Sequence, residues 1–294
     1  SLGLGDVYKR QAQLGGGVYV TSGCTFVMAT SSNIHNCIAN NDGGGVINHG
    51  TFQMRGGTIS TCTTVAFGGG GVCNNGTFIM SDGMIKGCTS PDGQYASGGG
   101  VRNSNQFTMT GGMIGDPDNE NDASHVYNTS SQETTLTISG NAKIYTDITN
   151  VGILNADGGE IAGTMTNDTN RYGTGSEGAA GSTEFHGKVT NTGTIRKGTF
   201  KNEVINESSG TINGGTFTGA ITNNDGMVLD GDFSGATLNG MLVITFDPNN
   251  GDQPSTQKVN WSKDGAALTA PDPVPTNEGH SIEGWYYDNN GTET

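Results

Sequence analysis

The sequence predicts an all-β solenoid in which coils of short parallel strands stack on one another. Three observations predict it. A tripeptide of an apolar residue, any residue and asparagine recurs along most of the chain, phenylalanine and methionine recur two residues apart, and glycine supplies 51 of the 294 residues. In such a stack identical side chains lie about 4.8 Å apart, so asparagine amides can hydrogen-bond along a column. Each coil needs few inward apolar residues, and glycine makes the corners.

The recurring asparagines are 15 to 29 residues apart, which fits a solenoid and is too variable for a rigid short repeat. Because each follows an apolar residue by two positions, we expect all of them in one inward column. The middle residue of each tripeptide then faces outward, where threonine is an ordinary strand former. The predicted column consists of Asn48, Asn74, Asn103, Asn128, Asn150, Asn167, Asn191, Asn206 and Asn223.

The first eleven residues, SLGLGDVYKRQ, resemble the translation of a transposase-type sequencing adapter. Asp6 to Gln11 is the specific part of that match. We therefore leave residues 1–11 out of the expected solenoid, which then covers residues 12–242. The alternative is a genuine N-terminal strand or cap.

Long, three-sided coils are expected in the solenoid up to about residue 125. Gly43-Gly44-Gly45 opens one coil, and extended runs around Phe52 and Ile59 follow, separated by glycine corners. Phenylalanine and methionine two residues apart point to the same side of a strand, so these pairs should stack inside. The pairs are Phe26 and Met28, Phe52 and Met54, Phe78 and Met80, and Phe107 and Met109.

Three of the five cysteines, Cys37, Cys62 and Cys88, each follow a recurring isoleucine by three positions and should form a column. Neighbouring layers are close enough for a disulfide. In-register parallel strands, however, place the two Cβ vectors alongside each other, which favours free thiols. A disulfide within the column is the alternative.

Shorter coils are expected over residues 126–242. Phe185, Phe200, Phe217 and Phe233 are 15 to 17 residues apart, while two polar stretches, 116–124 and 167–182, should be loops on the outside. Parallel crossovers are right-handed as a rule, so we expect a right-handed parallel β-helix.

The last unit, residues 243–294, differs in kind. Val243 to Phe246 alternates apolar and polar residues before an Asn-Gly turn, as a hairpin strand does. With Phe246-Asp247 and the closing Gly284-Trp285-Tyr286, this unit resembles the Listeria–Bacteroides (internalin B-type) repeat. His280 and Ile282 depart from the pattern of that family. The resemblance implies a small β-grasp-like module, of which residues 243–294 are a truncated copy with further strands expected after Thr294.

The coils resemble the right-handed parallel β-helix proteins, among them pectate lyases, polygalacturonases, autotransporter passengers and surface proteins. Sugar hydrolysis needs two placed carboxylates, and lyase chemistry needs calcium with a basic residue. The sequence places neither on a shared face, and Asp230 and Asp232 are expected at a solvated corner. We therefore predict no catalytic residues.

A calcium site is the one candidate metal site. Asp116, Asp118, Glu120 and Asp122 present alternate carboxylates, as hard-oxygen calcium loops do, although the glycine expected at the sixth position is missing. A solvated acidic loop is the alternative. No cofactor is otherwise required.

Charge and hydropathy restrict the partners. A net charge of −15 with only 13 Lys and Arg repels phosphate backbones, so nucleic acid is not expected. No apolar run of about 18 residues exists, so we expect no membrane insertion in this fragment. We predict a non-catalytic bacterial cell-surface protein, an adhesin-like stalk or scaffold located outside the cell, that contacts glycan or a surface protein of a host or neighbouring cell. The alternative is a carbohydrate-active β-helix enzyme, a lyase or hydrolase.

Overall fold

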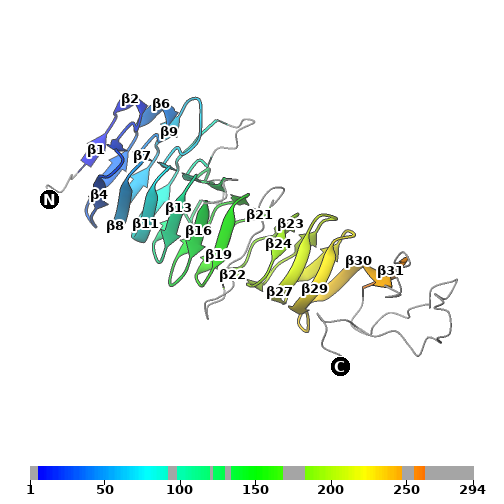
Figure 1. Ribbon diagram of the computed structural model, residues 1–294. Coiled ribbons are helices and arrows are strands. Elements are labelled where there is room, and N and C mark those ends of the chain that lie inside the picture. Colours follow the sequence, from blue (N-terminus) through cyan, green and yellow to red (C-terminus); the bar gives the residue numbers. More distant parts are fainter. Residues whose placement is uncertain are drawn as a thin grey trace, which may run out of the picture.

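The computed structural model describes residues 6–91, 98–119, 122–129, 134–167, 183–246 and 255–261. This part of the chain is an all-β parallel β-helix, an elongated stack of strands with no helix among the described residues (Figure 1). Accordingly, the described segments contain no helix of the length and hydrophobicity that a membrane span requires. Glu120 and most of residues 243–294 lie outside these segments.

One side of the stack is a 12-stranded sheet, here called the ladder sheet, which runs the full length of the described chain. Its strands are parallel except for the last pair. The strands in order are β3 (Val18–Val20), β7 (Val46–Asn48), β10 (Val72–Asn74), β12 (Val101–Asn103), β15 (Val126–Asn128), β18 (Ile148–Asn150), β21 (Met165–Asn167), β23 (Val189–Asn191), β26 (Val204–Asn206), β28 (Ala220–Asn223), β30 (Thr237–Phe246) and β31 (Ser255–Asn260).

All nine predicted asparagines occupy one column of this sheet. Each strand pairs asparagine with asparagine on the next coil, from Asn48 through Asn223. Their side chains are at most 3% exposed. The predicted column is therefore confirmed. At its two ends the register partner is not asparagine: Val20 pairs with Asn48, and Gly240 pairs with Asn223.

A 16-stranded sheet covers two further sides of the stack. The first side is formed by β4 (Thr25–Met28), β8 (Thr51–Ser60), β11 (Thr77–Lys86), β13 (Gln106–Met109), β16 (Thr135–Ile138) and β19 (Ile153–Ala156), and further along by β24 (Thr194–Ile195) and β29 (Met227–Asp232). The second side is formed by β1 (Asp6–Tyr8), β5 (Asn33–His35), the ends of β8 and β11, β14 (Met113–Ile114), β17 (Lys143–Ile144), β20 (Glu160–Ile161), β22 (Glu184–Phe185), β25 (Thr199–Phe200) and the end of β27 (Thr211–Phe217). The start of β27 pairs with β24 and belongs to the first side.

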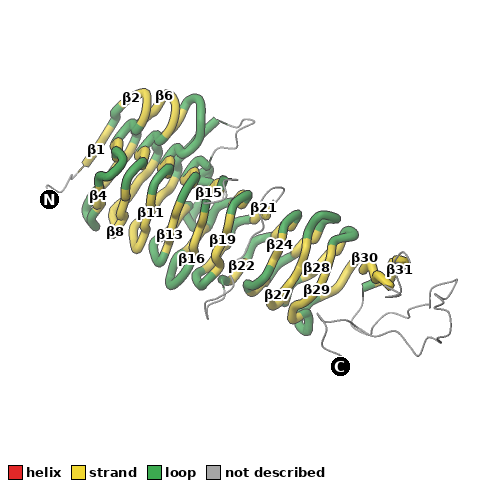
Figure 2. The backbone as a smooth tube through the Cα atoms, viewed as in Figure 1, coloured by secondary structure: helices red, strands yellow, loops and turns green. Residues whose placement is uncertain are grey.

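The long strands β8 and β11 continue from one side to the other. They turn at Gly57 (φ 84°) and Gly83 (φ 98°), where a left-handed backbone favours glycine. Figure 2 shows these strands bending around the edge of the stack. A single sheet therefore wraps two sides of each coil.

The first coils have a fourth strand that the three-sided expectation omits. A 3-stranded sheet of β2 (Gln11–Leu14), β6 (Ile38–Asp42) and β9 (Thr63–Thr64) adds a separate side. Its inward residue on β6 is Ala39, which is fully buried. Because alanine carries little of the periodic signal that phenylalanine and isoleucine provide, the sequence pattern does not reveal this side.

Residues 6–14 belong to the stack. Strand β1 pairs in register with β5, and β2 pairs with β6. The segment that resembles an adapter thus forms strands of the first coil, and its adapter origin stays a prediction.

The core consists of columns, as expected for the predicted Phe/Met and isoleucine repeats. Phe52, Phe78 and Phe107 are at most 1% exposed, and the ring centroids of neighbouring members are 4.8 and 4.4 Å apart. Strand register aligns the methionines in the same way. The prediction that these side chains stack inside is confirmed, apart from Phe26, which is only partly buried.

The aromatic column changes sides in the second half. Phe185 pairs with Ile161, so it continues the isoleucine column and not the earlier phenylalanine column. From there Phe185, Phe200, Phe217 and Phe233 stack with ring centroids 4.6 to 5.1 Å apart. The earlier phenylalanine side is filled by aliphatic residues instead, namely Leu136, Leu154, Ile195 and Ile212.

All five cysteines are free thiols, and all but Cys24 are buried. The column thiols pack against the third glycine of each triglycine corner. A Cβ on Gly45 would lie 3.4 Å from Sγ of Cys62 and 2.9 Å from Cγ2 of Ile59. The small thiol and the missing side chain thus fit together in this corner.

Strand β30 pairs in parallel with β28 up to Gly240 and, from Met241 on, antiparallel with β31. The antiparallel pairing confirms the predicted hairpin. Trp261, the residue after β31, contacts the end of the aromatic column edge-on, with its ring centroid 5.1 Å from that of Phe233. Most of the proposed repeat lies outside the described residues, so its β-grasp-like fold stays a prediction.

Candidate functional site in the acidic loop

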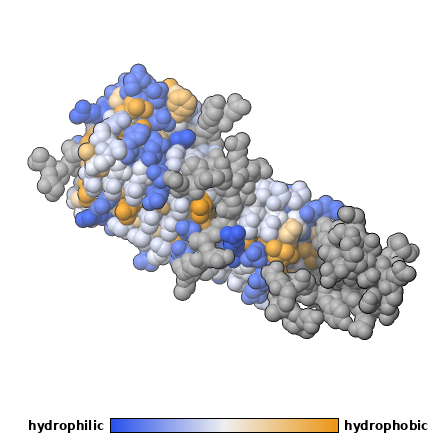
Figure 3. All heavy atoms as spheres, in the orientation of Figure 1, coloured by the Kyte–Doolittle hydropathy of each residue, from blue (hydrophilic) through white to orange (hydrophobic). Residues whose placement is uncertain are grey.

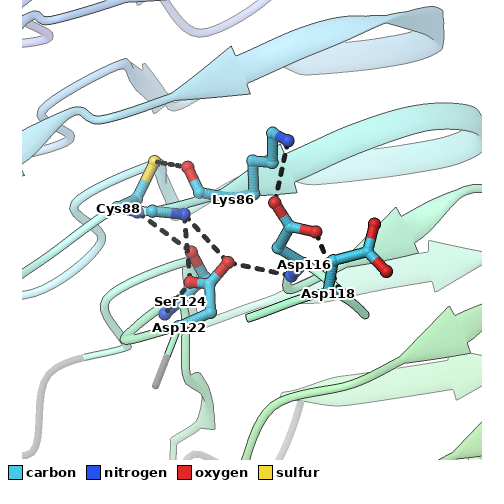
Figure 4. A network of polar contacts seen from close by, with 7 residues as sticks. Lys86, Cys88, Asp116, Asp118, Asp122 and Ser124 are labelled. Carbon is cyan, nitrogen blue, oxygen red and sulfur yellow. Dashed lines mark hydrogen bonds and ion pairs between the residues drawn. The ribbon is translucent and has the colours of Figure 1, made fainter. Parts of the chain in front are cut away.

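The acidic loop, residues 116–124, follows β14 and leads into β15 (Val126–Asn128). It lies where the sheet of β2, β6 and β9 has ended and the coil becomes shorter. Its described residues are 116–119 and 122–124. Figure 4 shows the side chains that this loop brings against the preceding coil.

Asp122 is the centre of the loop and is only 7% exposed. Its Oδ1 accepts hydrogen bonds from the backbone N–H groups of Gly87 at 3.0 Å and Ser124 at 2.8 Å. Its Oδ2 accepts from the N–H groups of Gly87 at 3.1 Å and Asp116 at 2.8 Å. Both carboxylate oxygens are therefore occupied by main-chain donors (Figure 4).

The reason for this arrangement is the change in coil length. In the two preceding coils the equivalent N–H groups, those of Asn36 and Thr61, donate to the backbone carbonyls of Ser60 and Lys86 in the next coil. At Gly87 the next coil diverges, and the Asp122 carboxylate takes the place of that carbonyl. A buried N–H without an acceptor would cost free energy, so Asp122 completes the edge.

Ser124 supplies a hydrogen-bond acceptor to the same edge at the next residue, Cys88. Its Oγ accepts the N–H of Cys88 at 3.0 Å, and its carbonyl accepts the hydroxyl of Thr146 at 3.0 Å. Ser124 is fully buried. No sequence pattern marks this serine, because it becomes important only where two coils of different length meet.

Asp116 is committed to another partner. Its Oδ2 lies 2.9 Å from Nζ of Lys86, and its Oδ1 accepts the N–H of Asp118 at 3.2 Å. The hydrogen bond from Lys86, followed by that from Asp118, holds the pKa of the Asp116 carboxyl below its usual range. The Asp118 side chain is exposed.

The carboxylates of Asp116 and Asp122 thus have separate partners and that of Asp118 is exposed, and the described residues hold no group of three or more His, Cys, Asp and Glu side chains that could bind a metal ion. Glu120 lies outside the described residues. Calcium binding by Asp116, Asp118, Glu120 and Asp122 therefore stays a prediction, while the observed role of Asp122 is to close a sheet edge.

A second charged cluster lies on the outside of β17, β20, β22 and β25. Glu160 and Glu184 are direct neighbours in register, which puts on one face a pair of carboxylates that could not be placed there from the sequence. The sequence does not reveal it, because the 23 residues between them include the long insert. Glu160 lies 3.0 Å from Nζ of Lys143, and Glu184 contacts His186 at 3.2 Å and Lys201 at 3.4 Å.

These two glutamates are arranged as ion pairs. The hydrogen bonds from His186 and then Lys201 hold the pKa of the Glu184 carboxyl below its usual range. A glycosidase needs one of its two carboxylic acids to keep its proton near neutral pH, which requires a raised pKa. Glu184 therefore suits an electrostatic link between coils and does not suit a general acid.

Comparison with known proteins identifies no relative of this chain. No protein-family model, no curated protein and no solved structure matches the chain.

Proposed function

We propose that the chain is a non-catalytic, adhesin-like scaffold of the bacterial cell surface, whose outward faces bind a ligand while the stack keeps them at a distance from the wall. The observation that supports this best is the unbroken asparagine ladder. Eight consecutive hydrogen bonds of 2.7 to 2.9 Å join the amide nitrogen of each asparagine to Oδ1 of the next, from Asn48 to Asn223.

The ladder gives the molecule the properties of a rod. Eight steps at about 4.8 Å per coil separate Asn48 from Asn223 by about 38 Å. Several of these amides also contact a turn: the amide nitrogen of Asn103 lies 3.1 Å from the carbonyl oxygen of Asn105 in its own turn and 3.0 Å from that of Thr135 on the next coil. One side chain therefore joins coil to coil and strand to turn, which favours stiffness along the axis.

The charged side chains support the same proposal. Ion pairs join neighbouring coils at Lys86 and Asp116, at Lys143 and Glu160, and at Lys188 and Glu203. Pairs of this kind on a solvated surface each contribute little to stability, and their placement between coils fits a structural face.

A polysaccharide panel, assayed for binding and for release of reducing ends, tests the proposal. We expect binding without cleavage. Cleavage that is lost in Glu184→Gln and kept in Glu203→Gln, a partly exposed glutamate outside the cluster, would make the chain an enzyme and overturn the proposal. Location has its own test, since an antibody against the folded chain should label intact cells of the source bacterium.

A further inference from the structure

The first side of the 16-stranded sheet presents a regular outer surface, here called the threonine face. It is formed by the two outward side chains of each of β4, β8, β11, β13, β16 and β19. Its twelve residues are Thr25, Val27, Thr51, Gln53, Thr77, Ile79, Gln106, Thr108, Thr135, Thr137, Ile153 and Asn155. Every one of them is exposed or partly exposed.

The threonine face carries no ionisable side chain, although the whole chain has a net charge of −15. Nine of its residues are β-branched and three carry amides. One charged group reaches it from the edge, where the Arg55 guanidinium donates to Oε1 of Gln53 at 2.7 Å. In Figure 3 the surface over β8, β11, β13 and β16 is mostly pale, with isolated hydrophobic and hydrophilic residues among the pale ones.

The spacing of the face is regular. Strand register runs from β4 to β19 without a shift within these four-residue segments, so its side chains form two straight columns. Five steps of about 4.8 Å give a length of about 24 Å, with the columns about 7 Å apart. β-branched side chains have few rotamers, so little conformational entropy is lost when a ligand orders them.

The size and charge of the face limit its occupant. A strip of this length and width covers on the order of 300–400 Å², well below the roughly 800 Å² per partner of a stable protein interface. Two copies of a chain with a net charge of −15 also repel each other. A long, narrow and uncharged ligand fits the strip better than a second protein does.

We infer that the threonine face binds a neutral polysaccharide. This inference rests on the proposed function, and it specifies the class of ligand and the surface that binds it. Hydroxyl and amide groups on the face donate and accept hydrogen bonds, as sugar hydroxyls do, and the intervening methyl groups meet the C–H surface of the sugar rings. Weak contacts repeated over six strands add up along one polymer chain. A neutral polymer also approaches this acidic chain without electrostatic repulsion.

The ladder sheet provides a matched control. Each of its three-residue strands turns one side chain outward, with the inward apolar residue and asparagine on either side, so it has a single outward column, which is buried at Ile47 and Cys73 and exposed or partly exposed at the threonines used here. Thr149, Thr166 and Thr190 are outward on three consecutive coils there. Thr51, Thr77 and Thr108 are outward on three consecutive coils of the threonine face.

The experiment compares the whole chain, a face variant (Thr51→Lys, Thr77→Lys, Thr108→Lys) and a ladder-sheet variant (Thr149→Lys, Thr166→Lys, Thr190→Lys). Both variants gain the same charge. Retention is measured on cellulose, chitin and insoluble mannan, with a polygalacturonate gel as the anionic comparison. Circular dichroism and the urea midpoint check that both variants fold as the unchanged chain does.

We expect at least one neutral polymer to retain the unchanged chain, the face variant to bind it at least about tenfold more weakly, and the ladder-sheet variant to bind as the unchanged chain does. Retention by no neutral polymer, equal binding by both variants, or a dimer that the face substitutions dissociate would each overturn the inference. If both variants bind a polymer equally and do not cleave it, the inference fails but the proposed function is not contradicted. Cleavage of the polymer contradicts the proposed function itself.

Discussion

The amide nitrogen of Asn128 lies 2.7 Å from Oδ1 of Asn150, and this relationship repeats at every step of the column. The same amide donates to the carbonyl of Ile153 at 3.0 Å. Asparagine is suited to the position because it carries a donor and an acceptor on one short, uncharged side chain. Aspartate would place like charges on neighbouring coils, and alanine would leave the chain of hydrogen bonds broken.

Replacement of Asn128 by alanine should therefore destabilise the stack. Oδ1 of Asn150 loses its donor in a buried place and the carbonyl of Ile153 loses one in a partly buried place, and a buried group left unpaired costs about 1–3 kcal/mol. We expect Asn128→Ala to lower the free energy of unfolding by at least about 2 kcal/mol, measured by urea denaturation at constant slope. Thr149, an outward residue of the next ladder strand, provides the control: Thr149→Ala should change the free energy of unfolding by no more than about 0.5 kcal/mol. Equal effects of the two substitutions would contradict the role of the ladder.

A second prediction concerns the aromatic column. Phe78 is fully buried and stacks on Phe52 and Phe107. Phe78→Ala leaves a cavity in a core that is one coil thick, and we expect a loss of about 3–5 kcal/mol in a urea melt. Ile79→Ala, on the outer side of the same strand, should cost far less. A loss under about 1 kcal/mol for Phe78→Ala would show that the ring does not support its neighbours.

Much of the fold could be predicted because its signals are periodic. Asn48 to Asn223 and the Phe/Met pairs recur at places where inward and outward residues alternate, and strand geometry alone then fixes the column. The spacing does not say on which side of a coil a residue lies. That is why Phe185 could be expected in the core, while its position in the isoleucine column could not.

The site could be predicted less well, for two physical reasons. Asp122 was identified by its charge, but its partners Gly87 and Ser124 depend on how a long coil meets a short one, which leaves no pattern in the sequence. Glu160 and Glu184 become neighbours only because an insert of variable length is looped out between their strands. Contacts across a change in coil length therefore require the structure.

Asp122 provides a third prediction, which separates edge closure from metal binding. Asp122→Ala leaves the N–H groups of Gly87 and Asp116 without their acceptor, so we expect a loss of about 2 kcal/mol or more in the free energy of unfolding. Asp118→Ala, an exposed carboxylate of the same loop, should change it by about 0.5 kcal/mol or less. If both substitutions have the same small effect, Asp122 does not close the edge.

Calcium titration tests the prediction for Asp116, Asp118, Glu120 and Asp122 directly. The calcium prediction requires heat in calorimetry and a rise in melting temperature at about millimolar calcium, the weak end of the extracellular range. Both should disappear in Asp118→Ala. Without heat and without a shift, the loop is an edge closure with a solvated acidic rim.

The fifth prediction concerns the pH dependence of stability through Cys73, whose side chain is fully buried on the outer side of the ladder sheet. Burial, together with the nearby Asp42 carboxylate, raises the pKa of its thiol from 9.0 to about 11. Below pH 9 the thiol is protonated in both the folded and the unfolded state, and its contribution to stability is complete. Between pH 9 and about 11 the unfolded chain loses this proton while the folded chain keeps it, so stability falls as the pH rises.

Within that window the unchanged chain should lose about 1.4 kcal/mol more per pH unit than Cys73→Ala, in which the other thiols are still present and their effects cancel. The free energy of unfolding is measured in urea from pH 8 to pH 11 under reducing conditions. Cys24→Ala is the matched control, because Cys24 is exposed. The stability of Cys24→Ala should therefore fall with pH at the same slope as that of the unchanged chain. Parallel profiles for the unchanged chain and Cys73→Ala would mean that the thiol reaches solvent and ionises in the folded state.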